Sequence, residues 1–543
     1  MRLNLAPARD VSLLGHPMTP KTARLVALAL AAAGGFILAV SGPPTAFVLG
    51  PWLGPALFYA ALVVDPAPAA GKPGKLRAVG RFFLRGALGF WFGFMCNAYT
   101  FRFVMDVIQR FTTLPWTVGA LAIILLAGAH ALRFFVSELV FRALASRGTH
   151  RIAAFAAAMY AGTFVPMMFP WTTGGAAMAW PVTVQLADLV GERGVVALFA
   201  VVSALFGEAI AAAVERRAPK AIGAPALGSF ALMGAVVLYG VVRMRTIDAE
   251  RDAAKHVKVA LVQPSIEARE RWERGRAEKI LAKLTTITKN AEAEGAELVI
   301  WPEAAYPYSM TAESRRAPVG AWAPLQPGVR GPVLTGTIMH SRDSAHADDA
   351  MNSAVVIGRD GSMSEPYHKM HLLWFGETVP LADVWPWLKK TFARGTGLTP
   401  GDRQVPLRAG PVVAAVLNCF EDTLPAAGRE AATVDPNLLV NITNDAWFAG
   451  SQESALHLRV ASMRTIEERR DMIRAVNYGP TTWVDAAGRI RGRLDPPEPG
   501  FLMTEPALLE RPATLYARFG DFPWAGSSAA ALVLALRRRK RAA

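Results

Sequence analysis

Apolar stretches long enough to cross a lipid bilayer dominate the first half of the chain and constrain its fold more than any other feature. A spanning helix needs about 20 mostly apolar residues. Because hydrocarbon offers the backbone no hydrogen-bond partners, such stretches must be helical. About eight spans are predicted, at residues 24–40, 44–64, 82–104, 116–141, 152–169, 195–214, 226–242 and 524–536.

These stretches divide the 543 residues into a membrane part and a globular part. Hydrophobic residues make up 52% of the sequence, which is more than in a typical soluble protein. The predicted segments are a cytoplasmic N-terminus (1–23), a membrane domain of about seven spans (24–242), a globular domain (243–523), a final span (524–536) and a basic cytoplasmic tail (537–543).

Lysine and arginine residues indicate the side of the membrane on which each connection lies, since cytoplasmic loops carry an excess of them. With the N-terminus in the cytoplasm, the cation-rich connections all fall inside: they contain Lys72, Lys75, Arg77, Arg81, Arg142, Arg147, Arg151, Arg216, Arg217 and Lys220. The opposite connections carry Arg110 and Arg193 and little else. The sequence therefore predicts a multi-pass protein of the inner (cell) membrane with its globular domain on the periplasmic, extracytoplasmic side. Membrane lipid, and not nucleic acid, is the partner that the net charge of +15 predicts.

The two cysteines, Cys96 and Cys419, lie in different parts of the chain. Cys96 falls inside an apolar stretch and Cys419 in the globular domain, so a disulfide between them is not predicted. The sequence has no phosphate-binding glycine loop and no zinc-type spacing of Cys and His, so no cofactor and no metal are expected. An unpaired thiol outside the cytoplasm is a liability unless it is used, which draws attention to Cys419.

The globular domain is predicted to be an α/β sheet domain with helices on its faces. Buried strands are predicted at 257–262, 297–301, 412–417 and 438–442. Apolar residues on one face between the first two strands predict a helix that Gly295 ends, and a second long helix is predicted over 453–472.

Three polar residues follow these strands or lie between them, and open α/β sheets place reactive groups at strand ends. Glu303 follows the second strand, Cys419 follows the third, and Lys369 lies between them in sequence. A thiol beside a carboxylate base and an ammonium that stabilises an oxyanion can transfer an acyl group. Taken singly, such a Cys is more often a core residue, such a Glu a solvated or capping carboxylate, and such a Lys a surface residue.

The motifs around these residues jointly resemble the nitrilase superfamily. They are Trp301-Pro302-Glu303, Lys369 ahead of Phe375-Gly376-Glu377, and Asn418-Cys419-Phe420-Glu421. With its predicted spans, the chain resembles the membrane-embedded branch of that superfamily, the apolipoprotein N-acyltransferase family. Further matches are Asn444-Asp445-Ala446-Trp447-Phe448, the stretch 474–481 and the stretch 514–521.

This resemblance implies an α-β-β-α sandwich and an enzyme with a Glu-Lys-Cys triad. Glu303 is implied as the general base, Lys369 as the group that stabilises the intermediate, and Cys419 as the nucleophile. The implied reaction moves an acyl chain from a phospholipid, through a Cys419 thioester, to the N-terminal amine of a diacylglyceryl apolipoprotein. Substrate-binding or supporting roles are implied for Glu377, Glu421, Trp272, Phe420 and Trp374.

The sequence departs from the family pattern near the nucleophile. Phe420 stands where the family usually has Tyr, and Trp374 stands where it usually has Pro. These departures leave the triad intact but leave the identity of the acceptor open. The segments 371–375 and 384–390 are rich in Trp and Leu, and their composition allows two interpretations. They could lie in the lipid interface and admit an acyl chain beside Lys369, or their tryptophans could pack the domain core.

Three functions remain open on the sequence. The first is the acyltransferase, and the second is a membrane-tethered amidase with the same triad and water as the acceptor. The third is a non-catalytic membrane scaffold of the same fold, against which the intact triad argues. A buried path from the membrane to Cys419 would favour the acyltransferase over the amidase.

Overall fold

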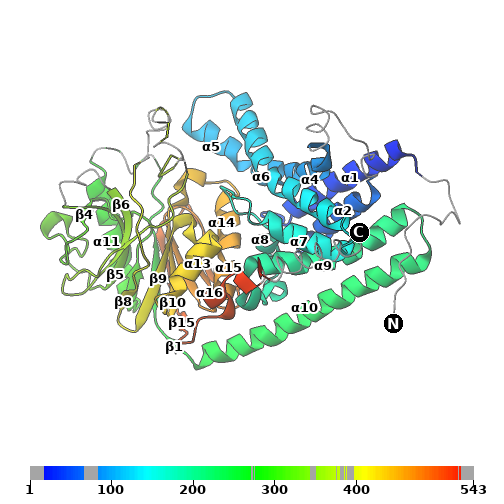
Figure 1. Ribbon diagram of the computed structural model, residues 1–543. Helices are drawn as coiled ribbons and strands as arrows, with labels where there is room; N and C mark the ends of the chain where they lie inside the picture. The colour runs from blue at the N-terminus through cyan, green and yellow to red at the C-terminus, as the bar shows by residue number, and fades with distance from the viewer. Residues whose placement is uncertain are drawn as a thin grey trace.

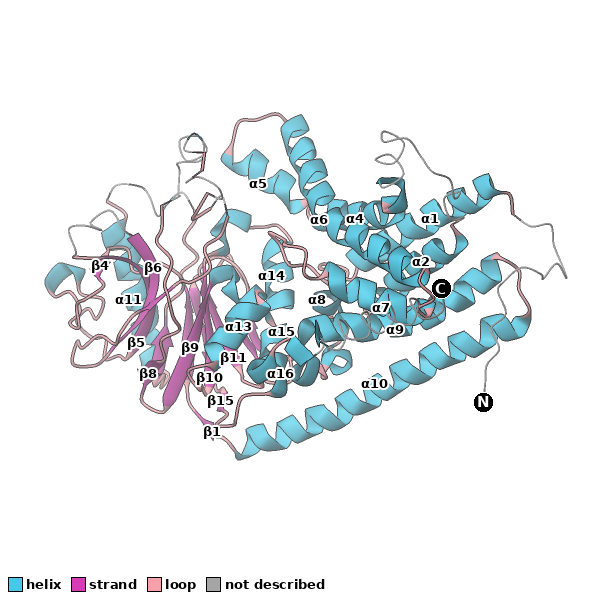
Figure 2. Ribbon diagram, viewed as in Figure 1, coloured by secondary structure: helices cyan, strands magenta, loops and turns pink. Residues whose placement is uncertain are grey.

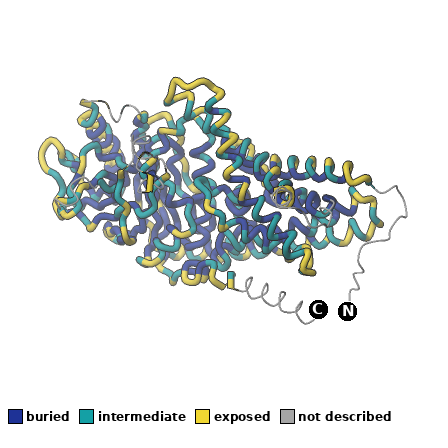
Figure 3. The backbone as a smooth tube through the Cα atoms, turned by 45° about the horizontal axis from the view of Figure 1, so that its top comes forward, coloured by how far each residue is buried: buried dark blue, intermediate teal, exposed yellow. Residues whose placement is uncertain are grey.

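The computed structural model describes residues 18–65, 83–268, 270, 273, 275–342, 350–374, 376–379, 384, 385, 387, 397–523, 525 and 526. A bundle of helices is followed by two packed β-sheets, and the long helix α10 (Pro219–Ala253) runs beside the bundle to reach the sheets (Figures 1 and 2). Buried residues lie along the strands and along the packed faces of the helices (Figure 3). The predicted fold class, a helical membrane bundle joined to an α/β domain, is confirmed.

The helical part contains the first seven segments that were predicted as spans. Its helices are α1 (Pro20–Ala39), α2 (Gly50–Val64), α4 (Ala87–Thr100), α5 (Phe103–Phe111), α6 (Trp116–Ala145), α7 (Arg151–Gly162), α8 (Thr173–Ala177), η1 (Pro181–Val184), α9 (Ala187–Val214) and α10. Among the described residues, 4 helices (α1, α6, α9 and α10) are long and apolar enough to cross a membrane, and α2 is a shorter apolar helix. The predicted tail and nearly all of the predicted span 524–536 lie outside the described residues.

Glycines let these helices approach one another closely. A Cβ on Gly35 of α1 would lie 2.2 Å from the carbonyl oxygen of Phe92 in α4. A Cβ on Gly34 would lie 2.6 Å from the carbonyl oxygen of Gly54 in α2. Helices in lipid gain little from the hydrophobic effect between them, so close van der Waals contact of this kind is what holds them together.

Several predicted span boundaries differ from the helices observed. The predicted span 82–104 ends at Thr100, and Phe103 begins the separate helix α5. The predicted span 195–214 begins earlier, at Ala187, and α9 contains a kink at Gly191, whose φ is +66°. Hydropathy locates an apolar segment but does not locate the turn that ends the helix, since that turn depends on tertiary contacts.

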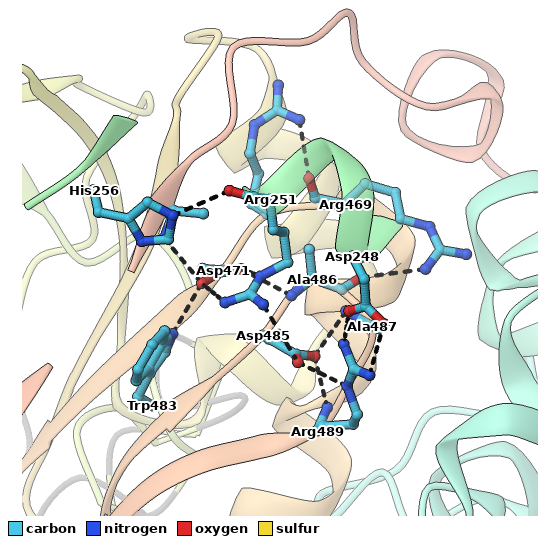
Figure 4. A network of polar contacts seen from close by, with 12 residues as sticks. Asp248, Arg251, His256, Arg469, Asp471, Trp483, Asp485, Ala486, Ala487 and Arg489 are labelled. Atoms are coloured by element: carbon cyan, nitrogen blue, oxygen red, sulfur yellow. Dashed lines mark hydrogen bonds and ion pairs between the residues drawn. The ribbon is translucent and has the colours of Figure 1, made fainter. Parts of the chain in front are cut away.

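The predicted span 226–242 is only the centre of α10, because ion pairs hold the polar end of this helix against the sheets (Figure 4). Arg251 donates to both carboxylate oxygens of Asp471, with N–O distances of 2.9 and 3.0 Å. Arg489 forms an ion pair with Asp248 one turn earlier on α10. The helix therefore continues past its apolar segment to Ala253.

The globular domain contains two large sheets. Their strands are β2 (Val259–Gln263), β3 (Leu298–Ile300), β4 (Met310–Thr311), β5 (Val333–His340), β6 (Ala350–Ile357), β7 (Tyr367–His368), β8 (Leu407–Ala409), β9 (Val412–Asn418), β10 (Leu438–Thr443), β11 (Met472–Val476), β12 (Thr481–Val484), β13 (Ile490–Leu494) and β14 (Gly500–Thr504). The 7-stranded sheet has the order β14-β2-β3-β5-β6-β7 with β4 beside β5, and the 6-stranded sheet has the order β13-β12-β11-β10-β9-β8. A small sheet pairs β1 (Lys255–His256) with β15 (Ala507–Leu508).

The two large sheets pack face to face and are covered by helices on their outer faces. Leu261 and Ile300 of one sheet share a buried core with Val416 and Val440 of the other. The helix α11 (Ala277–Ala293) packs on the outside of the 7-stranded sheet, as predicted from its apolar face. The helix α13 (Pro425–Ala432) packs on the outside of the 6-stranded sheet. The α-β-β-α sandwich is therefore confirmed.

The prediction of a single helix over 453–472 is wrong. This segment forms α14 (Glu453–Ala461) and α15 (Met463–Glu468), and Met472 already begins β11. Arg469 ends α15 in the left-handed conformation, with a φ of +51°. Its buried guanidinium donates to Asp188 of α9 at 2.9 Å. The helix therefore ends where Arg469 can contact the helical part, and no local sequence pattern reveals this contact.

Candidate active site

The structure brings the three predicted residues together at the ends of strands. Glu303 lies beyond β3, Lys369 directly follows β7, and Cys419 directly follows β9. Cys419 begins the short helix η5 (Cys419–Thr423) with a φ of +56°, which is unusual for a residue with a side chain. Such conformations persist only where the surrounding structure holds them, and they are concentrated at functional sites.

A glycine makes room for the turn that carries Glu303. A Cβ on Gly336 of β5 would lie 2.5 Å from the backbone nitrogen of Ala304 and 2.7 Å from the Cα of Glu303. Any larger residue would push this turn away from the sheet. The position of the Glu303 carboxylate therefore depends on Gly336.

Two carboxylates face one buried ammonium. Lys369 is only 1% exposed, and its Nζ lies 2.8 Å from Glu377 Oε2 and 3.5 Å from Glu303 Oε1. Burial raises the pKa of Glu303, and the positive charge of Lys369 opposes that increase. Burial acts to lower the pKa of Lys369, but the neighbouring negative groups, Glu303 foremost, raise it above its ordinary value. Lys369 is therefore held as a permanent ammonium.

The Cys419 thiol lies against the Glu303 carboxylate and is only partly exposed. Burial raises the pKa of Cys419 well above its ordinary value, the charge of Glu303 raises it further, and Lys369 lowers it. The resting thiol is therefore protonated and needs a base at the moment of reaction. Glu303 can act as that base, because burial also brings the pKa of its carboxyl group upward, toward that of the thiol.

Asparagine side chains hold this arrangement, and the sequence analysis gave them no role. The Nδ2 group of Asn352 in β6 donates to Glu303 Oε1 at 2.7 Å and to Glu377 Oε1 at 3.0 Å. Asn418 donates to Asn352 Oδ1 at 2.9 Å, and the backbone N–H of Asn444 donates to Glu303 Oε2 at 3.0 Å. One signal was available, since a buried Asn within a strand needs polar partners.

Glu421 supports the site and does not face the thiol. Its Oε2 accepts hydrogen bonds from the Asn418 N–H at 2.7 Å and from the Tyr367 hydroxyl at 2.8 Å. Its Oε1 accepts from the N–H groups of Met370 and His371 at 2.8 and 2.9 Å. This carboxylate therefore ties the segment that carries Lys369 to the segment that carries Cys419.

Phe420 and Trp374 line one pocket, and the described tryptophans of this stretch are exposed. The Phe420 ring faces Lys369 Nζ, with 5.4 Å from the nitrogen to the ring centroid. Trp374, Trp385 and Trp387 are 48%, 50% and 60% exposed, so the alternative in which these residues pack the core is wrong. Trp272 and Phe375 lie outside the described residues.

An apolar pocket of about 450 Å³ extends from the helical part to Phe420, the residue that follows Cys419. Met167 and Met168, which follow α7, form one wall. Leu373, Trp374 and Phe420 form part of the opposite wall. The pocket therefore connects the helical part with the segment that carries Cys419.

A second buried polar cluster lies in the segments that follow Cys419. Asp445, Glu453 and His457 place possible metal-ligand atoms within 4.8 Å of one another. However, His457 Nε2 lies 2.8 Å from Asp422 Oδ1, and Arg474 Nε lies 3.3 Å from Asp422 Oδ2. Burial acts to lower the pKa of His457, but its carboxylate partners, Asp422 foremost, raise it to about 10. Both ring nitrogens of His457 face carboxylates, Nε2 that of Asp422 and Nδ1 that of Asp445 at 3.4 Å, so the residues form an ion cluster.

Comparisons with known proteins agree with this architecture. A family model described as the apolipoprotein N-acyltransferase N-terminal domain matches residues 34–205, and the carbon-nitrogen hydrolase family model matches residues 258–507. The chain is 29% identical to an apolipoprotein N-acyltransferase of Geobacter metallireducens, over 84% of this chain and 87% of that protein. It is 32% identical to one of Bradyrhizobium diazoefficiens (68% and 70% covered) and 30% identical to one of Brucella melitensis (86% and 87% covered).

Proposed function

The chain belongs to the apolipoprotein N-acyltransferase family, and we propose that it transfers a fatty acyl chain from a phospholipid to the N-terminal amine of a diacylglyceryl-cysteine apolipoprotein. The observation that carries this proposal is the position of the pocket. One wall of the pocket belongs to the helical part and another adjoins Cys419, whose thiol contacts Glu303. Such a pocket suits an acyl chain that enters from the bilayer.

In the first half-reaction Glu303 takes the thiol proton of Cys419. The sulfur attacks the ester carbonyl carbon of the phospholipid, and Lys369 Nζ stabilises the negative oxygen of the tetrahedral intermediate. The C–O bond then breaks, and the leaving alkoxide receives the proton from Glu303. The products are a lysophospholipid and a thioester on Cys419.

In the second half-reaction the amine of the apolipoprotein attacks the thioester carbonyl carbon. Glu303 accepts a proton from the attacking nitrogen, and Lys369 again stabilises the tetrahedral oxygen. The C–S bond breaks, the thiolate is reprotonated, and an amide is released. The pocket contributes by holding the acyl chain, while the asparagine contacts of Glu303 keep its carboxylate directed at the thiol.

The chain is a protein of the inner membrane, and we place the sandwich domain on its periplasmic side. The motivating observation is the excess of Lys and Arg in alternate connections. A reporter fused after residue 250 is expected to be active in the periplasm. Activity of that reporter only in the cytoplasm would contradict the assignment of sides.

Two other functions are less well supported. A membrane-tethered amidase would use the same three residues but would not need a pocket walled by Met167 and Met168. A non-catalytic scaffold would not need a carboxylate, an ammonium and a thiol to be brought together.

Intact-mass measurement of the full-length protein after incubation with a phospholipid tests the proposal. We expect an added acyl mass on the wild-type protein and on Cys96→Ala, and no addition on Cys419→Ala. Addition of the apolipoprotein should then remove the acyl mass. A wild-type protein that hydrolyses amides but never carries an acyl mass from phospholipid would support the amidase instead.

A further inference from the structure

A second pocket, of about 570 Å³, lies between the helical part and the sandwich domain, and no residue lines both pockets. Its walls come from the connection between α1 and α2, from α14, and from the turn before β13. Arg102, Arg459 and Arg493 line it, so we call it the arginine pocket. The lining residues include three arginines but no Asp or Glu.

Arg459 carries most of the argument, because it has positive charge without a matching anion. Its Nη1 group is buried and has no hydrogen-bond partner within the described part of the chain. Burial lowers the pKa of Arg459, and no neighbouring carboxylate acts in the opposite direction. A buried N–H group of a guanidinium is costly to leave without an acceptor, so its position favours an external anion.

Of the other two arginines, Arg102 adds positive charge to the pocket, whereas the charge of Arg493 is already balanced by Asp495. Arg102 donates to the carbonyl oxygen of Tyr99 at 3.0 Å and stacks on the Tyr99 ring, and neither contact neutralises its charge. Arg493 forms an ion pair with Asp495, which does not line the pocket. Planar guanidinium groups that converge in this way suit the oxygens of a phosphate.

The remaining walls are largely apolar, which indicates that the ligand is an amphiphile. Pro43, Pro44, Met178, Leu458 and Ile490 contribute to them. The pocket also lies at the end of the bundle where α1 and α4 end, at Ala39 and Thr100. An exposed tryptophan, Trp116, begins α6 nearby in sequence, as is common at the boundary of a bilayer.

We propose that the arginine pocket binds the phosphate group of an anionic amphiphile at a site separate from the acyl-transfer site. The helix α14 separates the two sites. His457 of α14 contacts Asp422 in the helix that begins with Cys419, whereas Leu458 and Arg459 line the arginine pocket. The phosphate binds to Arg459 and Arg102, and the apolar part of the ligand lies against the prolines and Leu458. A phospholipid headgroup and free phosphate share this chemistry.

Calorimetric titration of the full-length protein in a neutral detergent tests this site. The background is Cys419→Ala, so no acyl transfer is needed and a failure of the proposed function would not affect the result. The probes are a short-chain phosphatidylglycerol, inorganic phosphate, and the matching short-chain diacylglycerol without phosphate. Arg459→Gln removes the unpaired charge, and Arg408→Gln on the exposed side of β8 is the matched control.

We expect Arg459→Gln to weaken binding of phosphatidylglycerol about 10- to 100-fold, the range for a charge-assisted hydrogen bond, and Arg408→Gln to leave it unchanged. Arg102→Gln should weaken it as well, which tests the site even if one variant folds poorly. Much tighter binding of phosphatidylglycerol than of inorganic phosphate identifies a lipid headgroup, whereas similar affinities identify a free anion. Equal binding of phosphatidylglycerol and diacylglycerol, or equal affinities in Arg459→Gln and Arg408→Gln, would overturn the proposal.

Discussion

Two buried polar clusters lie near Cys419 and differ in how their charges are balanced. In the first, the carboxylates of Glu303 and Glu377 share the single ammonium of Lys369. In the second, the cations His457 and Arg474 lie 2.8 and 3.3 Å from Asp422, and Asp445 also faces His457. Burial raises the pKa of the neighbouring Glu453 to about 8, so this carboxyl group adds no negative charge near neutral pH. The first cluster contacts the thiol of Cys419, while the second contacts the segments that carry it.

The difference in charge balance corresponds to a difference in task. Excess negative charge and burial raise the pKa of both Glu303 and Cys419, so a proton can pass between the carboxylate and the thiol. In the second cluster each cation is held by carboxylates, and His457 stays protonated because its pKa is raised to about 10. We therefore expect substitutions in the first cluster to change catalysis and substitutions in the second to change stability.

The largest effect that tests this comparison is expected from Glu303→Gln. The amide keeps the shape of the side chain but cannot accept the thiol proton, so the rate of acylation should fall about 10²- to 10⁴-fold. Glu303 also raises the pKa of Cys419, so its loss should not slow alkylation of the thiol by iodoacetamide at a fixed pH. In this variant the rate of acyl transfer should therefore fall while the rate of alkylation does not. An equal loss of both rates would show that Glu303 only positions the thiol.

Lys369→Met should have the next largest effect. Loss of one donor to a tetrahedral oxyanion typically lowers the rate about 10²- to 10³-fold, and both half-reactions should be slowed. Because Lys369 lowers the pKa of Cys419, its removal should also slow alkylation, in contrast to Glu303→Gln. The measurement is the rate of alkylation against pH in both variants. An unchanged alkylation rate in Lys369→Met would show that this ammonium does not lie close enough to the thiol to lower its pKa.

His457→Gln should change stability more than turnover per folded molecule. Removing one partner of a buried ion pair typically costs about 3–5 kcal/mol, because the remaining charge is left uncompensated. The folded-state pKa of His457, about 10, lies above its ordinary value of 6.5. Its stabilising contribution is therefore complete below about pH 6.5 and is lost as the pH rises through about 10.

Thermal unfolding between pH 6 and pH 10 checks this prediction. The wild-type protein should lose its advantage over His457→Gln as the pH rises, while the exposed His340→Gln control should follow the wild type. The facing groups are Asp422, Asp445, Glu453 and Arg474. Of these, Glu453 also makes the folded protein less stable as the pH rises. Burial raises its pKa to about 8, so ionising its carboxyl group costs more in the folded than in the unfolded protein. A constant difference between the two proteins at every pH would contradict the assignment of a protonated His457.

The sequence predicted what local pattern determines. The strands that end before Glu303 and Cys419 are short runs of apolar residues. Both the strands and the reactive groups that follow them could therefore be predicted from the sequence. The role of Asn352 could not, because it depends on two carboxylates that meet only after folding. For the same reason the break after α15 was missed, since the Arg469 side chain binds Asp188 of α9. Span positions were predictable from hydropathy, but their ends depend on contacts such as that of Arg251 with Asp471.

The smallest effect is expected from Phe420→Tyr, which concerns the boundary between the first cluster and the pocket. The Phe420 ring lies 5.4 Å from Lys369 Nζ and lines the apolar pocket. A tyrosine ring offers the ammonium a similar aromatic face, so turnover should change less than about threefold. Phe420→Ala removes the ring and lets water reach Lys369, and turnover should fall about tenfold, within the range of a desolvated cation–π contact. The measurement is the rate of acyl transfer from one phospholipid in both variants. A loss in Phe420→Tyr as large as that in Phe420→Ala would show that the pocket excludes a hydroxyl at this position.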